Sequence, residues 1–285
     1  MQLQFPMNPL LIFLKNQNTY VMSTKCYVRF FFFIGLFWFA LTFNSCKKNV
    51  LSSTYTIYSD GADYYLQNNI NLKREAKKEN FNDAIELAIQ KIEITGGTIT
   101  LRGGKYKVSK PIRLQSNMHI QGEGKPTVII ISNNFNGGEA IFVADSANDV
   151  SVKNLSIIQD NNLKKISGII FDHCGTSKIS EVFMLGLNNN GVWIRNNSFL
   201  CQVDNSTFGD IQNNAIFLQK LDQGRIGDWA PNQVSECIIY SSGIGINTER
   251  AVSLSITNCQ VFQTRGAAYY IGKQSNAVLI SGSRS

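Results

Sequence analysis

The C-terminal half of the chain is built from short runs in which apolar and polar residues alternate. One run of six residues occurs in five full copies, at 152–157, 179–184, 203–208, 234–239 and 256–261. A sixth copy begins at Ile280. The third residues of successive copies lie 27, 24, 31, 22 and 24 positions apart. A second run, a small residue followed by apolar ones, is interleaved with the first at 168–171, 191–194, 215–218 and 243–246. Repeats of this length predict an array of stacked units.

The period of the alternation indicates what each unit contains. A period of two residues predicts β-strands, and the Asn, Gly and Ser residues between the runs predict turns. No segment within the repeats has the length and phase of a helix. Several short strands in each unit of roughly 25 residues predict an all-β fold, a parallel β-helix with one coil per repeat.

One helix is predicted directly before the array. Its apolar face would consist of Phe81, Ile85, Leu87, Ala88 and Ile92. Asn80 or Asn82 would cap its start, and Gly96-Gly97 would end it. We expect this helix to cover the open end of the first coil, where strand edges and apolar side chains would otherwise be exposed.

The third position of the six-residue run carries Asn at 154, 205 and 258. Asn tolerates the left-handed backbone that a corner between two strands requires, and stacked amides can bond from coil to coil. Glu181 and Glu236 occupy the same position, so we expect this ladder to be intermittent.

The N-terminal region has a different character. Residues 30–43 form a nearly unbroken apolar run of 14 residues, preceded by Lys25 and Arg29. This run is shorter than the about 20 residues of a bilayer-spanning helix and is typical of a secretory signal. The residue after Ser45 is Cys46, as in a bacterial lipoprotein signal, where that cysteine carries lipid. A plain signal peptide and a short anchor helix remain alternatives.

These features divide the chain into three parts. Residues 1–45 are the predicted signal region, with Met22 as its natural start, and residues 46–78 are a tether and entry segment. Residues 79–285 are the predicted β-helix domain, and we expect further coils to follow because the last repeat is incomplete. The localisation implied is export to the cell envelope, with membrane attachment through Cys46.

Charge and cysteine content exclude several classes of function. The net charge of +7 falls to +4 without residues 1–45, and no basic run with interleaved aromatic residues indicates nucleic-acid binding. Cys237 and Cys259 occupy one position of successive repeats, so we expect them to stack inside the coils as small apolar residues. The chain has no Cys/His spacing for zinc, and its two histidines rule out a histidine-rich metal site.

The segment 82–124 contains a series of short motifs: 82–89 (NDAIELAI), 96–101 (GGTITL), 104–106 (GKY), 112–114 (IRL), 116–117 (SN) and 121–124 (QGEG). This series resembles the opening of the pectate-lyase-like superfamily. The resemblance covers residues 80–285 and implies a right-handed parallel β-helix with an N-terminal capping helix. The superfamily includes polysaccharide lyases, hydrolases, epimerases, phage tailspikes and non-catalytic surface proteins, so the fold alone does not define the activity. The polygalacturonase signatures Asn-Thr-Asp, Gly-Asp-Asp, Gly-His-Gly and Arg-x-Lys are all absent.

Candidate catalytic residues lie after the six-residue run and before the second run of each repeat, which is here called the Gly-Ile run. Asp160 and Asp210 occupy this stretch two coils apart, which would separate them by roughly 9–10 Å, near the range of an inverting pair of carboxylates. Asn188 and Asn190 lie between them as predicted substrate-binding residues. Arg265, two coils further on, would bind a uronate carboxylate or act as a base. Solvated turn residues are the alternative for each of them.

Two other features have a functional and a structural interpretation. The longest repeat contains an insertion, 221–231, in which Trp229 would stack on a sugar ring and Arg225 would pair with an acidic group. The alternative is a loop whose Trp covers an apolar patch and whose Arg pairs locally. Asp172-His173 forms an acid–base pair in sequence, but its place opposite the expected groove favours a turn Asp and a packed His.

Two functions are compatible with the sequence. One is an exported, lipid-anchored protein that cleaves or modifies an acidic polysaccharide, as a lyase or a hydrolase. A lyase would neutralise the uronate with Arg or a divalent cation such as Ca²⁺. The other is a non-catalytic surface protein that binds glycan. Either implies a polysaccharide partner, and oligomeric state is left open.

Overall fold

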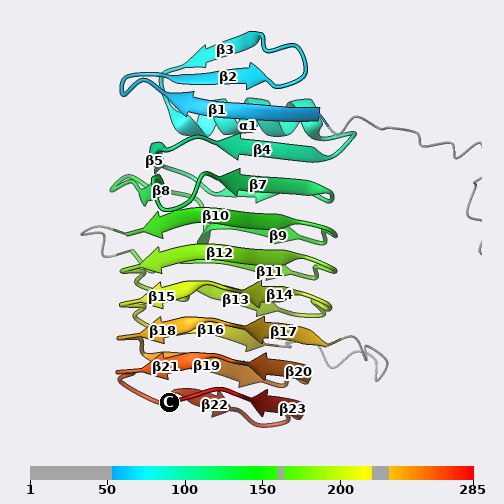
Figure 1. Ribbon diagram of the computed structural model, residues 1–285, viewed down its shortest axis with the longest axis vertical. Coiled ribbons are helices and arrows are strands. Elements are labelled where there is room, and N and C mark those ends of the chain that lie inside the picture. The colour runs from blue at the N-terminus through cyan, green and yellow to red at the C-terminus, as the bar shows by residue number, and fades with distance from the viewer. Residues whose placement is uncertain (1–52, 160–163, 220–230) are drawn as a thin grey trace, which may run out of the picture. The chain divides into compact units, whose positions relative to one another are not determined.

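The computed structural model describes residues 53–159, 164–219 and 231–285. These residues form a right-handed parallel β-helix of about seven coils with one short helix near its start (Figure 1), as the sequence predicts. The signal region 1–45 and Cys46 lie outside the described residues. None of the helices in the described part of the chain is long and apolar enough to cross a membrane.

Each coil contributes three strand positions, two to a 16-stranded sheet (sheet A) and one to a seven-stranded sheet (sheet B). The first position in sheet A is occupied by β4 (Gly97–Leu101), β7 (Met118–Gly122), the first parts of β10 (Ser151–Ile158) and β12 (Lys178–Leu185), β14 (Gln202–Asp204), β17 (Asn232–Ser235), β20 (Val252–Thr257) and β23 (Asn276–Ser281). The second is occupied by β5 (Gly104–Val108), β8 (Thr127–Ile131), the second parts of β10 and β12, β15 (Thr207–Gly209), β18 (Ile238–Tyr240) and β21 (Gln260–Phe262).

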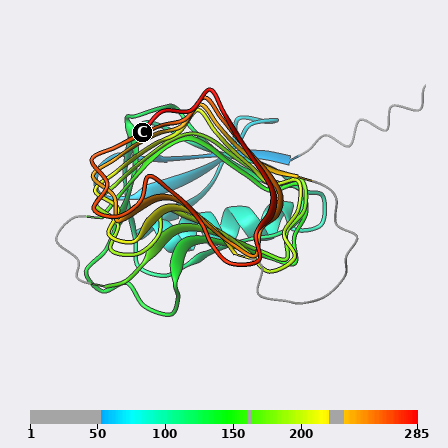
Figure 2. The same ribbon diagram turned by 90° about the horizontal axis from the view of Figure 1, so that it is seen from below.

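Sheet B contains the third strand of every coil, and all its pairings are parallel. Its strands are β6 (Ile112–Leu114), β9 (Ala140–Asp145), β11 (Ser167–Asp172), β13 (Val192–Arg195), β16 (Asn214–Gln219), β19 (Ile244–Glu249) and β22 (Tyr269–Ile271). The four Gly-Ile runs of the sequence correspond to β11, β13, β16 and β19. Viewed along the axis, successive coils follow nearly the same closed outline (Figure 2).

The core consists of stacked aliphatic side chains, one set per coil. Val152 pairs with Ile179, which pairs with Val203, and the column continues through Val234 and Ile256; all five are fully buried. Each such side chain contributes about 1.5–3 kcal/mol when it is buried. Because the strands are in register, the alternating pattern of one coil places its apolar side chains directly on those of the next.

The predicted left-handed corner within sheet A is confirmed. Asn154, Asn205 and Asn258 have φ values of 58°, 46° and 54°, and Glu181 and Glu236 have 55° and 53°. Glutamate therefore adopts the corner conformation as well, although it is rarely left-handed. Hydrogen bonds between the coils hold this corner: the backbone N–H of Asn205 donates to the carbonyl of Ser235, and that of Glu236 donates to the carbonyl of Thr257.

Helix α1 (Phe81–Ile92) lies across the end of the first coil, which confirms the predicted cap (Figures 1 and 2). The Asn80 side chain accepts a hydrogen bond from the backbone N–H of Asp83 and thereby caps the helix. Phe81, Ile85 and Ile92 are fully buried against the coil.

Residues 53–78, within the predicted tether and entry segment, form three strands, β1 (Ser53–Ser59), β2 (Tyr64–Asn68) and β3 (Arg74–Lys78). Strand β1 pairs in parallel with β4, and β2 and β3 continue sheet A as an antiparallel meander.

The described cysteines are buried and none forms a disulfide with another described residue. Cys237 and Cys259 directly precede the paired strands β18 and β21, so the predicted stacking of these two thiols is confirmed. Cys174 and Cys201 form a second stacked pair, in which the Cys201 thiol lies 3.7 Å from the Cys174 carbonyl. Burial raises the pKa of the Cys201 thiol to about 12.

Candidate functional site on the outer face of sheet B

Sheet B carries a column of large side chains on the side that faces away from the core, and three of them, Ile170, Phe217 and Asn247, are buried. In β13, Val192 and Ile194 are core residues and Trp193 alternates with them. The register places on the same outer column, here called the aromatic column, Arg113, Val143, Ile170, Trp193, Phe217, Asn247 and Tyr270. A second column, two residues further along each strand and here called the charged column, contains Asp145, Asp172, Arg195, Gln219 and Glu249.

The middle of the aromatic column is closely packed. The rings of Trp193 and Phe217 stack with centroids 5.7 Å apart and planes at 19°. The guanidinium of Arg195 lies 4.7 Å from the Trp193 ring centroid, within cation–π range. Trp193 Nε1 is buried and has no hydrogen-bond partner among the described residues. Aromatic rings beside polar groups form an amphipathic surface of the kind that binds sugar rings through their C–H faces and hydroxyls.

Asp172 is the centre of the charged column. Its Oδ2 accepts a hydrogen bond of 2.7 Å from Arg195 Nε, and its Oδ1 accepts one from the Asn196 amide. The imidazole of the next residue is a third partner, because His173 Nδ1 lies 2.8 Å from Asp172 Oδ1. Arg195 also extends to Glu139, at 2.8 Å. Three side chains, Arg195, Asn196 and His173, thus contact one carboxylate.

The environment of Asp172 keeps its carboxylate ionised. Burial alone would raise its pKa, but hydrogen bonds from Asn196 and Arg195 and the positive charge of Arg195 outweigh burial, so the pKa of Asp172 is lowered. Arg195 is likewise desolvated, yet its bonds to Asp172 and Glu139 raise its pKa. The ionised carboxylate holds the His173 imidazole in place through its Nδ1.

His173 lies at a corner with a left-handed backbone, at φ 51°. Ser146, Asn196 and Arg250, at the corresponding corners of other coils, have φ values of 53°, 56° and 55°. This conformation therefore belongs to the corner of the coil and is not strain particular to a site. The interpretation of His173 as a packed residue is wrong, because its side chain is 42% exposed. Asp172 is the last residue of strand β11, not a turn residue, and it is buried in a network of charged groups.

Asp145, Asp172 and His173 are the group of described residues whose ligand atoms lie close enough to share a metal ion, within 4.8 Å of one another. They do not fit Ca²⁺, which takes 6–8 oxygen ligands. Both Asp172 oxygens already accept hydrogen bonds, and the Arg195 cation lies against one of them. The cluster is better suited to proton transfer than to holding a divalent cation.

The opposite side of sheet B, where its strands begin, carries a ladder of side-chain amides. This side is here called the amide edge. Asn213 donates to Asn189 at 2.8 Å, and Asn214 donates to Asn190 at 2.8 Å. Asn247 continues the ladder by donating to Asn214 at 3.0 Å. The sequence predicts coil-to-coil amide bonding for the corner in sheet A, whereas these amide bonds lie at and beside the amide edge of sheet B.

The predicted residues Asp210 and Arg265 also lie at the amide edge. Asp210 is exposed at φ 51°, and its side chain forms no hydrogen bond or ion pair with any described residue. The Arg265 guanidinium donates to the carbonyls of Ile211, at 2.9 Å, and Gln212, at 3.1 Å. Arg265 therefore links coils in the structure, and the catalytic role of both residues stays a prediction.

Two of the predicted substrate-binding residues, Asn188 and Asn190, belong to the described part of the chain. Asn190 is 3% exposed and is a member of the amide ladder, and the backbone N–H of Asn188 donates to Gln159 at 3.0 Å. The other two, Arg225 and Trp229, lie outside the described residues, and so does the predicted catalytic residue Asp160.

Sequence reasoning misses the charged column because its members are far apart in the chain. A usable signal exists: Asp172 and Arg195 occupy the same place in successive Gly-Ile runs, four positions after the glycine that opens each run. The alignment of the fourth Gly-Ile run is wrong, since Gly245, and not Gly243, stacks on Ala215. A slip of two residues preserves the alternation of strand faces, so the hydrophobic pattern alone does not reveal it.

Comparison with known proteins supports the fold. The family model described as rhamnogalacturonase A/epimerase, pectate lyase-like, matches residues 74–284. The chain belongs to this family. A comparison with curated protein sequences gives no significant match.

Two solved structures illustrate the similarity. The A-module of the mannuronan C-5 epimerase AlgE4 from Azotobacter vinelandii is 14% identical, with a TM-score of 0.57 over 70% of this chain. This chain spans 63% of that module. The tailspike protein of E. coli bacteriophage HK620, solved with a pentasaccharide, is 13% identical, with a TM-score of 0.46 over 70% of this chain and 46% of its own. At 14% identity the similarity to the AlgE4 module supports the fold alone.

Proposed function

We propose that this member of the pectate-lyase-like family cleaves or modifies an acidic polysaccharide on the outer face of sheet B. The observation that carries the proposal is the Asp172–His173 pair, joined at 2.8 Å, beside Asp145 and close to Trp193 through Arg195. The matching family model, which is described as rhamnogalacturonase A/epimerase, pectate lyase-like, supports the choice of substrate class.

His173 is the proposed proton-transfer group. Its side chain is exposed, and Asp172 fixes its orientation through Nδ1. Removal of a proton next to a uronate carboxylate is shared by β-elimination and epimerisation, and proton transfer to a leaving oxygen is part of hydrolysis. Asp145 supplies a second, exposed carboxylate within 4.8 Å of this pair. Trp193, which is partly exposed in the aromatic column, would contact a sugar ring beside these groups.

Export and a lipid anchor at Cys46 belong to the same proposal. They rest on the apolar run at 30–43 and on the cysteine that follows Ser45. Export would bring the sheet B face into contact with polysaccharides outside the cytoplasm.

The experiment is incubation of the full chain with pectate, alginate and other acidic polysaccharides. The ultraviolet absorbance of an unsaturated product reports elimination, new reducing ends report cleavage, and solvent deuterium incorporation reports epimerisation. His173→Ala should reduce turnover by at least about 100-fold, the usual contribution of a general acid or base. Asp210→Asn is the matched comparison: loss of turnover there, with His173→Ala unaffected, would place the chemistry at the amide edge instead. Glycan binding without any of the three signals would favour the non-catalytic alternative.

A further inference from the structure

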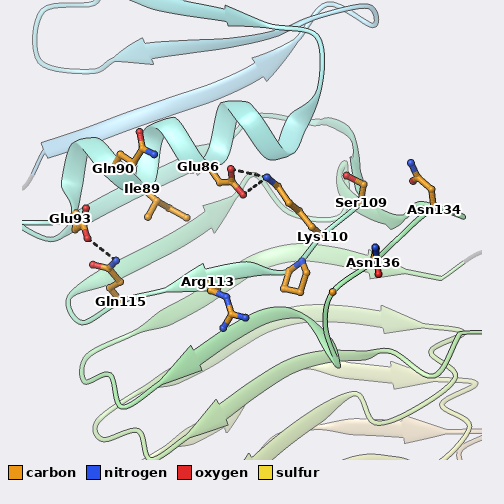
Figure 3. Close-up of a pocket in the computed structure, with 12 residues that line it drawn as sticks. Glu86, Ile89, Gln90, Glu93, Ser109, Lys110, Arg113, Gln115, Asn134 and Asn136 are labelled. Carbon is orange, nitrogen blue, oxygen red and sulfur yellow. Dashed lines mark hydrogen bonds and ion pairs between the residues drawn. The ribbon is translucent and has the colours of Figure 1, made fainter.

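A pocket of about 800 Å³ lies between helix α1 and the first coils (Figure 3). Glu86, Ile89 and Gln90 lie at helical spacing on one face of α1, and Glu93, the C-cap of the helix, continues that face. The facing wall comes from the segment 109–115, and a third side comes from the loop between β8 and β9 at 134–137. A volume of this size is within the range of small-ligand sites, about 300–1,000 Å³.

Hydrogen bonds hold the walls of the pocket in place. The Asn82 side chain accepts from the backbone N–H of Ser109 at 2.8 Å and donates to the carbonyl of Lys110 at 3.0 Å, which fixes the segment 109–110 to the helix. Phe135 is 2% exposed and anchors the β8–β9 loop in the core. The backbone N–H of Asn136 donates to the carbonyl of Ser109 at 2.8 Å. The walls are therefore preorganised, which lowers the cost of ligand binding.

The charges in the pocket are partly satisfied by one another. Lys110 forms an ion pair with Glu86 at 2.8 Å, and the Gln115 amide donates to Glu93 at 3.1 Å, as Figure 3 shows. Arg113 differs from them. It is exposed and forms no hydrogen bond or ion pair with any residue that the structure describes. Its guanidinium offers five donors in a planar fork that matches a carboxylate or sulfate.

The remaining lining suits a sugar. Gln90, Gln115, Asn134 and Asn136 line the pocket, and side-chain amides both donate to and accept from hydroxyl groups. Gln115 already donates to Glu93, and Asn134 accepts from Ser132, so each keeps part of its hydrogen-bonding capacity for a ligand. Ile89 and Pro111 supply apolar area. Arg113 pairs in register with Val143, so it stands at the head of the aromatic column of sheet B.

We propose that this pocket binds an anionic sugar residue, with Arg113 contacting its acid group and the four amides contacting its hydroxyls. The proposal rests on the proposed function and extends it, because it places one end of an acidic glycan at the head of the aromatic column.

The test is calorimetric binding of short oligogalacturonates, of a sulfated oligosaccharide and of a neutral oligosaccharide of equal length to the full chain. Arg113→Gln should weaken binding of the acidic probe by at least about tenfold, the usual effect of losing a charged hydrogen bond. Lys107→Gln, which removes an exposed positive charge from β5 in sheet A, should leave affinity unchanged. Arg113→Lys keeps the charge but not the fork and should recover part of the affinity.

Equal affinity of the wild type and Arg113→Gln for every probe would overturn the proposal, as would binding of neutral probes only. The carboxylate and sulfate probes separate the two acid groups. The proposed function is distinguished by turnover: if Arg113→Gln keeps both the affinity and the rate of the wild type, the pocket proposal alone fails. Arginine-dependent binding with no turnover on any substrate removes the proposed enzymatic function alone.

Discussion

The ion pair between Asp172 and Arg195 makes a quantitative prediction about stability. In Asp172→Asn the side chain keeps its shape but loses its charge, and Arg195 then has only Glu139 as an ionic partner among the described residues. The Asp172 and Arg195 side chains are 12% and 22% exposed. Removing one partner of a fully buried pair costs about 3–5 kcal/mol, and residual exposure and Glu139 reduce this to about 2 kcal/mol.

The pH dependence follows from the lowered pKa of Asp172. A carboxyl group with a lower pKa in the folded state stabilises the protein above its unfolded pKa of about 3.9, and that stabilisation is lost as the pH falls through the folded value. The difference between the wild type and Asp172→Asn should therefore be constant between neutral and mildly acidic pH and should shrink below about pH 4.

The assay is urea unfolding followed by circular dichroism at neutral pH and near pH 3. Asp145→Asn, an exposed carboxylate in the same column, is the control and should change the free energy of unfolding by less than about 0.5 kcal/mol. A loss for Asp172→Asn no larger than that of the control would refute the reasoning, and so would a loss that stays the same at acidic pH.

Three further predictions concern other parts of the chain. In Gly191→Ala the added Cβ would lie 2.5 Å from a backbone oxygen of the next coil, so we expect a loss of about 1–3 kcal/mol in thermal unfolding; Gly104→Ala, whose nearest contact is 3.7 Å, should have little effect, and equal losses would contradict the packing argument. The buried Cys201 thiol, with its pKa raised to about 12, should react with a disulfide reagent only in urea, and rapid labelling of the native protein would contradict its burial. Cys46→Ser should abolish incorporation of labelled fatty acid in a bacterial host, and persistent label would exclude Cys46 as the anchor.

The sequence predicts the fold well because the structure repeats. The period-two alternation and the recurring six-residue run identify the coils and their inward faces, and Asn154 marks a left-handed corner. The same corner at Glu181 is unpredictable from residue preference, because hydrogen bonds between coils hold that backbone. The three strands at 53–78 lack the repeat and have no comparable signal.

The candidate site is less accessible from sequence. Asp172 and Arg195 are neighbours only because β11 and β13 pair in register, and that register depends on loops of unequal length. Arg113 and the pocket residue Glu93 line one pocket although 20 positions of sequence separate them. Side-chain partners, which decide whether Arg265 binds substrate or backbone carbonyls, do not follow from residue type.

The stacking of coils also has a mechanical consequence. The backbone hydrogen bonds between coils in the described part of the chain join adjacent coils, and side chains such as Arg195 and Arg265 reach two coils away. A pull on the two ends of the chain would therefore detach coils one after another instead of breaking the molecule at once. Each event would release roughly 24 residues, or about 80 Å of extended chain. A force–extension trace should therefore show a saw-tooth of nearly even steps, lengthened where the 31-residue repeat comes free.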